Sequence, residues 1–393
     1  MNTADLASPL LPQDAHPVDV FDASAPSSGA DTSRIAAHAP AREIRDLPGH
    51  LAKRIQLATR VRTAANSGRL NVTSIRWPAD SGHRQGVPAR VRSAILGGSL
   101  HVVTPPDTTR VLDLVLTQIG AANTGTVQIG SGGGLRTRTE AAGRPAILRL
   151  GKMDTPADPS RHYAGLRAAR GIPEVPVTLG QGGIGDVMWS AESLISGRVQ
   201  TRLDPTTLSE ADQFLRSLPA ADRVTTPLDQ IARLAALAGS DANAVRAIGE
   251  RIGLKLAGIP GVLIHGDFWM GNLLFRKGTL VAVVDWDGWE PAGAPATDLL
   301  HLLADCRRRQ DRTSYGAQAV DRFWRYPKVR RLLDQHLSDL GLPSDNGTVD
   351  ALGESWWLTA IAAAVTRNPK LATDPAWIQR NLRQAAVDLA KSN

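Results

Sequence analysis

Three side chains in the second half of the chain, Asp267, Asn272 and Asp285, have the types and spacing that phosphoryl transfer requires. That reaction needs an acceptor hydroxyl held in line and metal ions that neutralise the phosphates, with little covalent help from the protein. Asp267 would orient the hydroxyl and accept its proton, while Asn272 and Asp285 would offer oxygens to Mg²⁺. His265 opens the same run and joins Asp267 in the predicted catalytic pair, with bracing of the loop as its favoured role.

Short apolar segments flank these residues and are expected to bring them together. Residues 261–264 predict a strand that leads into the loop of Asp267. Residues 273–275 and 280–284 predict two further strands, which begin after the amide and end at the second carboxylate. An apolar hairpin would therefore hold two carboxylates and an amide close to one point.

The joint pattern carries more weight than any one of its residues. A lone aspartate after a buried strand is usually a turn residue, and each tryptophan near the motif could simply fill a core. His-Gly-Asp followed by Asn at this spacing should arise by chance in a chain this long on the order of once in a thousand sequences. The sequence therefore favours a kinase.

These residues resemble the aminoglycoside phosphotransferase and choline kinase-like superfamily, which consists of small-molecule kinases with a protein-kinase-like fold. The Gly in His265-Gly266-Asp267 is that superfamily's form of the motif. The resemblance implies that Asp267 is the catalytic base and that Asn272 and Asp285 are metal ligands. It also implies a structural Asp298, which would cap the following helix and brace the active-site loops.

A glycine-rich turn upstream is a candidate phosphate contact, because glycine lets backbone amides approach phosphates closely. It lies between predicted strands at 126–129 and 135–139, although a flexible hairpin tip explains it almost as well. Its predicted nucleotide contacts are Gly130, Ser131 and Gly132.

The next predicted strand, residues 145–150, carries Arg149 where many kinases have a lysine on the nucleotide phosphates. A guanidinium can fork onto phosphate oxygens, so ATP remains the expected donor. The helix expected at 160–170 contains no acid to pair with this cation, and Asp154 or Asp158 could substitute.

A second glycine cluster, residues 180–185, is expected to be the turn of a hairpin. The segment that follows resembles the superfamily's interlobe hinge, whose backbone would hydrogen-bond adenine at Glu192, Ser193 and Leu194.

Beyond this point helical spacing predominates, which predicts an α+β, protein-kinase-like bilobal fold with a small antiparallel-sheet N-lobe and a mainly helical C-lobe. The expected helices are 208–218, 227–238, 242–257, 299–306, 320–340, 351–366 and 375–391. The predicted organisation is a disordered tail (1–41), a basic N-terminal accessory segment (42–124), an N-lobe with the hinge (125–197) and the C-lobe (198–393).

Charge separates the two N-terminal segments. Residues 1–41 carry five aspartates against one arginine and are rich in Pro, Ala and Ser, which predicts disorder. Residues 42–110 carry twelve Lys or Arg against four acids, a net charge of +8, so this segment accounts for the net charge of +7 of the whole chain. Their pattern predicts a helix at 51–65, strands at 70–77 and 100–103, and a helix at 109–119. With no nucleic-acid motif and one aromatic residue, a nucleic-acid surface is disfavoured.

The sequence thus predicts an ATP- and Mg²⁺-dependent transferase that phosphorylates a hydroxyl of a small molecule, such as a sugar, a glycosylated metabolite or an antibiotic. Arginines after the catalytic motif, 307–309 and 312, disfavour a cationic acceptor. The alternatives are a catalytically weak kinase-like binding module and, less favoured, a protein kinase. One cysteine and no membrane-length apolar run favour a cytoplasmic protein. The oligomeric state stays open.

Overall fold

A computed structural model describes residues 20–21, 34–38, 71–77, 98–104, 111–123, 128–129, 134–155, 157–225 and 228–391. The chain divides into two compact units. The sheet unit consists of Met1–Ser160 with Thr178–Leu194, and the helical unit consists of Arg161–Val177 with Ile195–Asn393. Residues 161–177 therefore pack with the helical unit, although the sequence assigned them to the segment 125–197.

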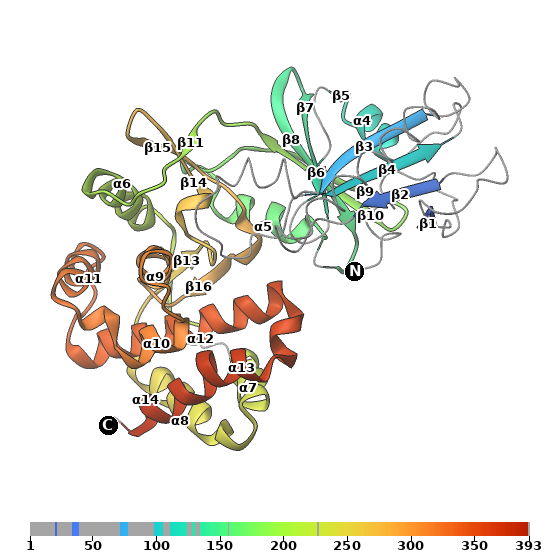
Figure 1. Cartoon of the computed structure of the whole chain (residues 1–393). Coiled ribbons are helices and arrows are strands. Elements are labelled where there is room, and N and C mark those ends of the chain that lie inside the picture. The colour runs from blue at the N-terminus through green and yellow to red at the C-terminus, as the bar shows by residue number, and fades with distance from the viewer. Residues whose placement is uncertain are drawn as a thin grey trace. The chain divides into compact units, whose positions relative to one another are not determined.

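Among the described residues, the sheet unit is built on a ten-stranded sheet in the order β1-β2-β4-β3-β6-β7-β8-β10-β9, with β5 paired to β7 (Figure 1). The strands are β1 (Val20–Phe21), β2 (Arg34–His38), β3 (Asn71–Trp77), β4 (Gly98–Thr104), β5 (Ala122–Asn123), β6 (Gln128–Ile129), β7 (Leu135–Ala141), β8 (Arg144–Lys152), β9 (Thr178–Ile184) and β10 (Val187–Ser193). Helix α4 (Val111–Gln118) precedes β5. The strands β7 to β10 confirm the predicted antiparallel N-lobe sheet.

Alternating side chains explain the central strands of this sheet. In β8, Ala146, Leu148 and Leu150 are buried on one face, which is the period of two that a half-buried strand requires. The turn between β7 and β8 has positive φ at Ala142 and Gly143, as the tight turn of a hairpin needs. Arg149 lies on the other face of β8, opposite Ser190 of β10.

The second glycine cluster lies mostly inside β9 rather than in the turn. A Cβ at Gly180 or Gly182 would lie 3.2 or 2.8 Å from the indole of Trp189, which covers these two residues from the neighbouring strand. Of the cluster, only Gly185, with φ +59°, lies in the turn itself. The predicted hairpin is confirmed, and the glycines are explained by a bulky neighbour.

The accessory segment extends the same sheet. The predicted strands at 70–77 and 100–103 are β3 and β4, and the predicted helix at 109–119 is α4. Strand β3 joins β6 through the parallel pairing of Arg76 with Gln128. Strands β1 and β2 fall within residues 1–41, for which composition predicts disorder. The rest of that stretch and the predicted helix at 51–65 lie outside the described residues.

The helical unit contains α5, which begins at the last residue of the sheet unit, and two three-stranded sheets. Its helices are α5 (Ser160–Ala168), α6 (Pro205–Arg216), α7 (Leu228–Ala238), α8 (Ala242–Lys255), α9 (Thr297–Asp311), α10 (Tyr315–Val320), α11 (Pro327–Asp339), α12 (Asn346–Arg367), α13 (Pro375–Ile378) and α14 (Gln384–Lys391). One sheet has the order β11 (Arg198–Val199), β14 (Leu273–Arg276), β15 (Thr279–Val283), and the other β12 (Ala220–Ala221), β13 (Gly261–Ile264), β16 (Glu290–Gly293).

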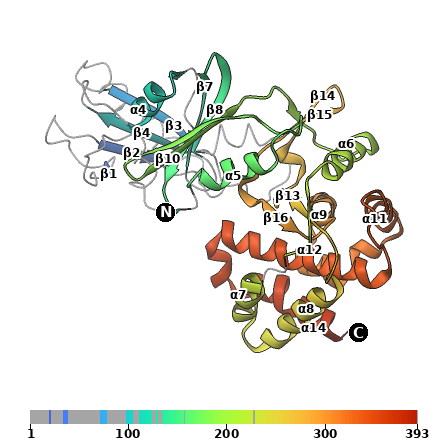
Figure 2. The same ribbon diagram turned by 180° about the vertical axis from the view of Figure 1, so that it is seen from behind.

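Helix α12 is the centre of the helical unit and contacts α7, α8, α9 and α10 (Figure 2). Its side chains Trp356 and Trp357 are fully buried. Gly353 lets the indole of Trp324 lie against the helix backbone, because a Cβ there would come within 2.2 Å of that ring. Apolar residues on most sides of α12 therefore match its place inside the core.

The predicted helix at 320–340 is wrong in one respect, because the chain breaks it near its start. Arg322 is left-handed with φ +44°, and a 3₁₀ turn covers Phe323–Arg325. Tyr326 is extended, as expected before a proline, and Pro327 then begins α11. The other predicted helices are present, with shifted ends and with a π-helical turn at Gln379–Arg383 between α13 and α14.

The fold class is confirmed as α+β, with a sheet N-terminal region and a helical C-terminal region. No helix among the residues that the structure describes is long and apolar enough to cross a membrane.

Candidate active site

The loop after β13 is held rigidly by His265. This side chain is fully buried, and its Nε2 lies 2.9 Å from the carbonyl oxygen of Val284. Its Nδ1 accepts from the backbone N–H of Asp267 at 3.2 Å. Burial lowers the pKa of His265, so the imidazole is neutral. Its bonds tie the catalytic loop to β15, which supports the bracing role rather than proton transfer.

Asp298, in the first turn of α9, holds the same loop through hydrogen bonds to its backbone. Its two carboxylate oxygens accept from the backbone N–H groups of His265 and Gly266, at 2.6 and 3.0 Å. Burial raises the pKa of this carboxyl. The residue at the N-cap of α9 is Ala296, so the expected capping role of Asp298 is wrong, and its bracing role is confirmed.

Gly266 explains why the motif has glycine where protein kinases have arginine. Its φ is +75°, a conformation that L side chains rarely adopt. A Cβ there would also come within 1.9 Å of the carbonyl oxygen of Gly288. The two loops that carry the predicted site residues therefore cross at a point where a side chain does not fit.

Asp267 presents an ionised carboxylate. Burial opposes its ionisation, but Arg367 and His301 outweigh this effect and hold the pKa of Asp267 below its usual value. Arg367 donates to Oδ1, and His301 Nε2 lies 3.8 Å from the same oxygen. The amide of Asn272 donates to the backbone oxygen of Asp267 at 2.9 Å and to Oδ2 at 3.3 Å. Such a carboxylate can receive a proton from a hydroxyl.

The structure brings Asn272 and Asp285 to adjacent ends of the β14–β15 hairpin. Val284 N–H donates to the carbonyl of Asn272 at 2.9 Å, and Asp285 follows directly with left-handed φ of 67°. The side-chain nitrogen of Asn272, Nδ2, makes the bonds to Asp267, and the side-chain oxygen takes no part in them. One carboxylate and one amide oxygen form the sparse, hard ligand set that suits Mg²⁺, which keeps several waters and phosphate oxygens. In the part of the chain that the structure describes, no cluster of three His, Cys, Asp or Glu could hold a metal.

Helix α5 has a role that the sequence did not indicate. Arg161 donates to the backbone oxygens of Asp287 and Trp289 and pairs with Glu290 at 2.8 Å. His162 Nδ1 accepts from the backbone N–H of Trp286 at 3.1 Å. The first turn of this helix therefore fixes the loop that follows Asp285.

The acid that pairs with Arg149 comes from the neighbouring strand. Arg149 Nε donates to Oε1 of Glu192 at 2.9 Å, and both side chains are nearly buried. Asp154 and Asp158 do not take this role: Asp158 accepts instead from the backbone N–H groups of Asp154 and Ser160. Arg149 thus has the carboxylate partner that helix α5 lacks.

The predicted adenine contacts lie at the end of β10. Glu192 and Ser193 pair with Ile147 and Ala146 of β8, and the N–H of Leu194 donates to the carbonyl of Pro145 at 2.9 Å. That N–H is therefore engaged within the sheet. The predicted phosphate contacts Gly130, Ser131 and Gly132 lie outside the described residues.

Of the three tryptophans near the motif, two have packing roles. Trp286 is fully buried and donates to the carbonyl of Val283, and Trp289 donates to the carbonyl of Arg161. Trp269 is half-buried, and the guanidinium of Arg309 lies 4.4 Å from the centre of its ring. Only Trp269 among them has the surroundings of an acceptor contact.

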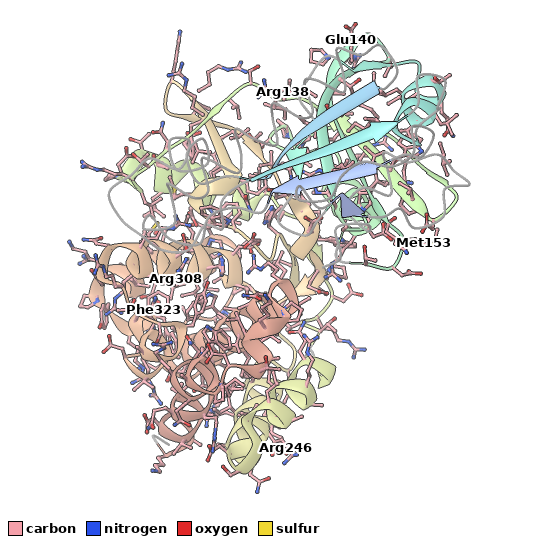
Figure 3. All side chains as sticks on the ribbon, turned by 45° about the vertical axis from the view of Figure 1, so that its right-hand side comes forward. Arg138, Glu140, Met153, Arg246, Arg308 and Phe323 are labelled. Atoms are coloured by element: carbon pink, nitrogen blue, oxygen red, sulfur yellow. The ribbon has the colours of Figure 1, made fainter. Side chains whose placement is uncertain are left out.

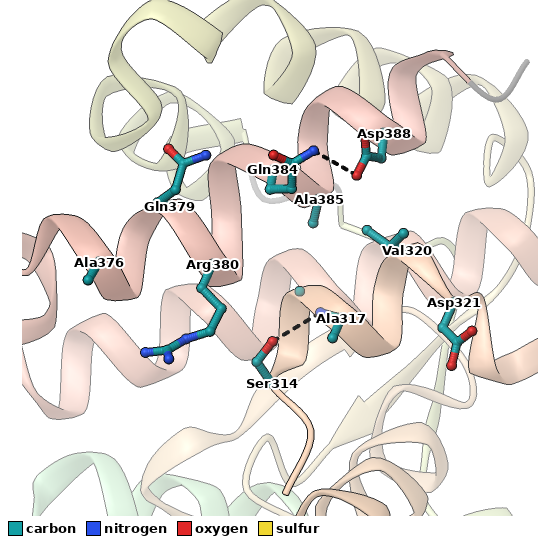
Figure 4. A pocket seen from close by; sticks show the side chains of 11 residues that line it. Ser314, Ala317, Val320, Asp321, Ala376, Gln379, Arg380, Gln384, Ala385 and Asp388 are labelled. Atoms are coloured by element: carbon teal, nitrogen blue, oxygen red, sulfur yellow. Dashed lines mark hydrogen bonds between the residues drawn. The ribbon is translucent and has the colours of Figure 1, made fainter.

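A hollow in the helical unit lies away from these residues. A cavity of about 770 Å³ opens between α10 and the C-terminal helices, and Figure 4 shows Ser314, Asp321, Arg380 and Asp388 around it. None of the predicted site residues lines it. The chemistry of Asp267 is a better guide to the active site than the size of this hollow.

Two contacts of Asp267 were not foreseen. Arg367 ends α12, 100 residues after Asp267, and His301 lies on α9. Neither belongs to a motif. The only sequence feature that could have indicated His301 is its position one helical turn after Asp298, on the same buried helix.

Comparison with known proteins gives a family for the chain. The model of the phosphotransferase enzyme family (APH) matches residues 23–332. No curated protein matches the chain. Similar solved structures include a thermostable mutant of aminoglycoside phosphotransferase APH(4)-Ia in ternary complex with ADP and hygromycin B (14% identity, TM-score 0.46, 72% of this chain and 100% of that one). Another is an ethanolamine kinase from Plasmodium vivax (11% identity, TM-score 0.44, 67% of this chain and 80% of that one).

A third is aminoglycoside phosphotransferase APH(3'')-Id from Streptomyces rimosus in complex with ADP and streptomycin (14% identity, TM-score 0.39, 59% of this chain and 94% of that one). The family match covers most of the chain and includes the whole catalytic loop. The chain therefore belongs to the phosphotransferase enzyme family.

Proposed function

We propose that this protein transfers the γ-phosphoryl group of ATP to a hydroxyl of a small molecule, such as a sugar, a glycosylated metabolite or an antibiotic. The observation that carries the proposal is the ionised carboxylate of Asp267, held beside the amide of Asn272 on a loop braced by buried His265 and Asp298. A single cysteine and the proposed use of ATP support an activity in the cytoplasm.

In the proposed reaction, the acceptor oxygen attacks the γ-phosphorus and its proton passes to Asp267. The bond between the γ-phosphorus and the bridging oxygen breaks, and ADP leaves with that electron pair. Asn272 and Asp285 would hold Mg²⁺, which supplies positive charge to the phosphates when it is bound. Arg149, oriented by Glu192, would add a guanidinium for the phosphates.

The test is ADP formation by the full chain with ATP and Mg²⁺ across a panel of sugars, hydroxylated metabolites and antibiotics. We expect Asp267→Asn to lower kcat by roughly 10²–10⁴-fold, the usual contribution of a general base, while ATP binding stays within about twofold. Arg246→Gln, an exposed residue of α8 (Figure 3), is the matched control and should behave as wild type. Equal turnover in Asp267→Asn and wild type would reject the assigned role.

One observation favours a second candidate, a kinase-like module that binds nucleotide without turnover. Arg367 occupies Oδ1 of Asp267, the atom that would receive the proton. Mg²⁺-dependent ATP binding together with no turnover on any acceptor class would support this module. Turnover that disappears in Asp267→Asn would exclude it.

A further inference from the structure

The surroundings of Asp267 are rich in guanidinium groups. Arg367 contacts its carboxylate directly, although 45% of the arginine side chain is exposed. Its Nη1 donates to Asp267, and its Nε is directed to the carbonyl of Ala363 in its own helix. An arginine has five N–H donors, so this one retains donors for a ligand beside the carboxylate.

Two further arginines, Arg308 and Arg309, lie on α9, on the same side as Asp267. The guanidinium of Arg308 (Figure 3) lies 5.7 Å from the ring centre of Tyr315, which stacks on His301 beside Asp267. That of Arg309 lies over Trp269, two residues from Asp267.

One buried carboxylate anchors this pair. Asp305 accepts from Arg308 and from Arg309, each at 2.5 Å. Burial lowers the pKa of His301, so that neighbour is neutral. Three guanidinium groups therefore face two carboxylates around the predicted acceptor position.

This excess of guanidinium groups disfavours a cationic acceptor, because the positive charge of Arg367 beside Asp267 would repel it. It suits an acceptor with a negative group close to its reacting hydroxyl. A guanidinium matches the two oxygens of a carboxylate or phosphate, and such charge-assisted bonds are roughly twice as strong as neutral ones.

Building on the proposed function, we infer that the acceptor carries an oxyanion, a carboxylate or a phosphate, and that Arg367 is the specificity-determining residue that binds it. Without acceptor, Arg367 pairs with Asp267. With acceptor, the oxyanion takes the guanidinium, and Oδ1 of Asp267 becomes open to the hydroxyl. Binding of the oxyanion by Arg367 therefore also frees the carboxylate of Asp267 to act as the base. A molecule without an oxyanion leaves Arg367 paired with Asp267.

The first test uses acceptors that share one sugar ring and differ in the charge of one substituent: glucose, glucosamine, glucuronate and glucose 6-phosphate. We expect turnover to favour the two anions, and their comparison separates carboxylate from phosphate. Arg367→Gln should raise KM for the favoured anion by roughly ten- to a hundredfold, the effect of losing a charged hydrogen bond. Arg367→Lys should restore part of the loss. Preference for glucose or glucosamine, or an unchanged KM in Arg367→Gln, would overturn the inference.

A binding measurement decides the matter if none of these sugars turns over. Calorimetric titration of inorganic phosphate and of glucuronate into the full chain, saturated with Mg²⁺ and AMP-PNP, reports oxyanion binding without chemistry. We expect Arg367→Gln to weaken the binding of at least one anion tenfold or more, and Arg246→Gln to leave it unchanged. Equal or absent binding in wild type and Arg367→Gln overturns the inference.

The two proposals fail in different ways. If wild type does not bind AMP-PNP in the presence of Mg²⁺, the proposed phosphotransferase is contradicted. Titration of the anions into the nucleotide-free chain then tests whether Arg367 binds an oxyanion. Good turnover of a neutral or cationic acceptor would support the phosphotransferase and contradict the role of Arg367. Thermal melting of each variant confirms that it is folded.

Discussion

The arrangement of Asp267, Asn272 and Asp285 depends on buried groups that hold the surrounding loop. The buried imidazole of His265 and the carboxylate of Asp298 satisfy backbone groups of the catalytic loop, and burial without such partners would cost free energy. Asp285 itself has a left-handed φ of 67°, a conformation that residues other than glycine adopt at a cost in free energy.

At the metal site, we expect Asp285→Asn to weaken Mg²⁺-dependent ATP binding by at least tenfold, because the only charged ligand of the predicted pair is removed. Asp287→Asn is the matched control, since its side chain is 64% exposed and lies two residues further on. Titration of ATP with and without Mg²⁺ measures both. Equal losses in the two variants would argue against Asp285 as the ligand.

Gly266 offers a test of the motif itself. Gly266→Ala combines positive φ with a 1.9 Å overlap, so we expect it to lower the free energy of unfolding by about 3 kcal/mol or more. Gly278→Ala, with φ +91° and no atom within 4 Å, has the strain alone and should cost about 1 kcal/mol. Urea unfolding compares them, and similar costs would show that the crossing with Gly288 is not tight.

Among the elements, the catalytic hairpin was the most predictable. Its two strands are short, apolar and bounded by glycine and polar residues, and the structure places them at β14 and β15. The predicted strand before them is β13, which lies in the other three-stranded sheet. Most helices were also found, because their apolar spacing is strong, but α10 was not predicted. The breaks between helices were harder to predict, because the chain turns after α10 at Arg322, a left-handed arginine, and not at a glycine.

Helix α12 depends on its N-cap, Asp345. This side chain accepts from the N–H groups of Gly347 and Thr348, at 2.9 and 3.1 Å, and bonds to the Thr348 hydroxyl. We expect Asp345→Ala to lower the free energy of unfolding by about 1 kcal/mol at neutral pH.

The pH dependence gives this cap a signature. The hydroxyl and amide bonds from Thr348 hold the pKa of Asp345 below its usual value. A carboxyl whose folded-state pKa is lowered stabilises the fold above its unfolded pKa, about 4, and loses that contribution as the pH falls through the folded value. The difference between wild type and Asp345→Ala should therefore shrink below about pH 4. A difference that stays constant to pH 2 would contradict a charged cap.

At the scale of the whole molecule, the local sequence pattern could not predict which residues far apart in the chain pair with each other. Arg149 and Glu192 are 43 residues apart, and Asp267 and Arg367 are 100 apart. No periodicity relates such residues, and their pairing follows only from the register of β8 with β10 and from the end of α12. The grouping of residues 161–177 with the helical unit has the same origin, because Arg161 and His162 bond to the loop after Asp285.

The central claim concerns where the phosphoryl group goes. ³¹P NMR of the full chain with ATP, Mg²⁺ and the best acceptor of the panel follows ADP, inorganic phosphate and phosphate ester together. We expect one ester to form for each ADP, and both to form roughly 10²–10⁴-fold more slowly in Asp267→Asn. ADP accompanied only by inorganic phosphate, or ester formed equally by Asp267→Asn, would contradict a phosphotransferase that uses Asp267 as its base.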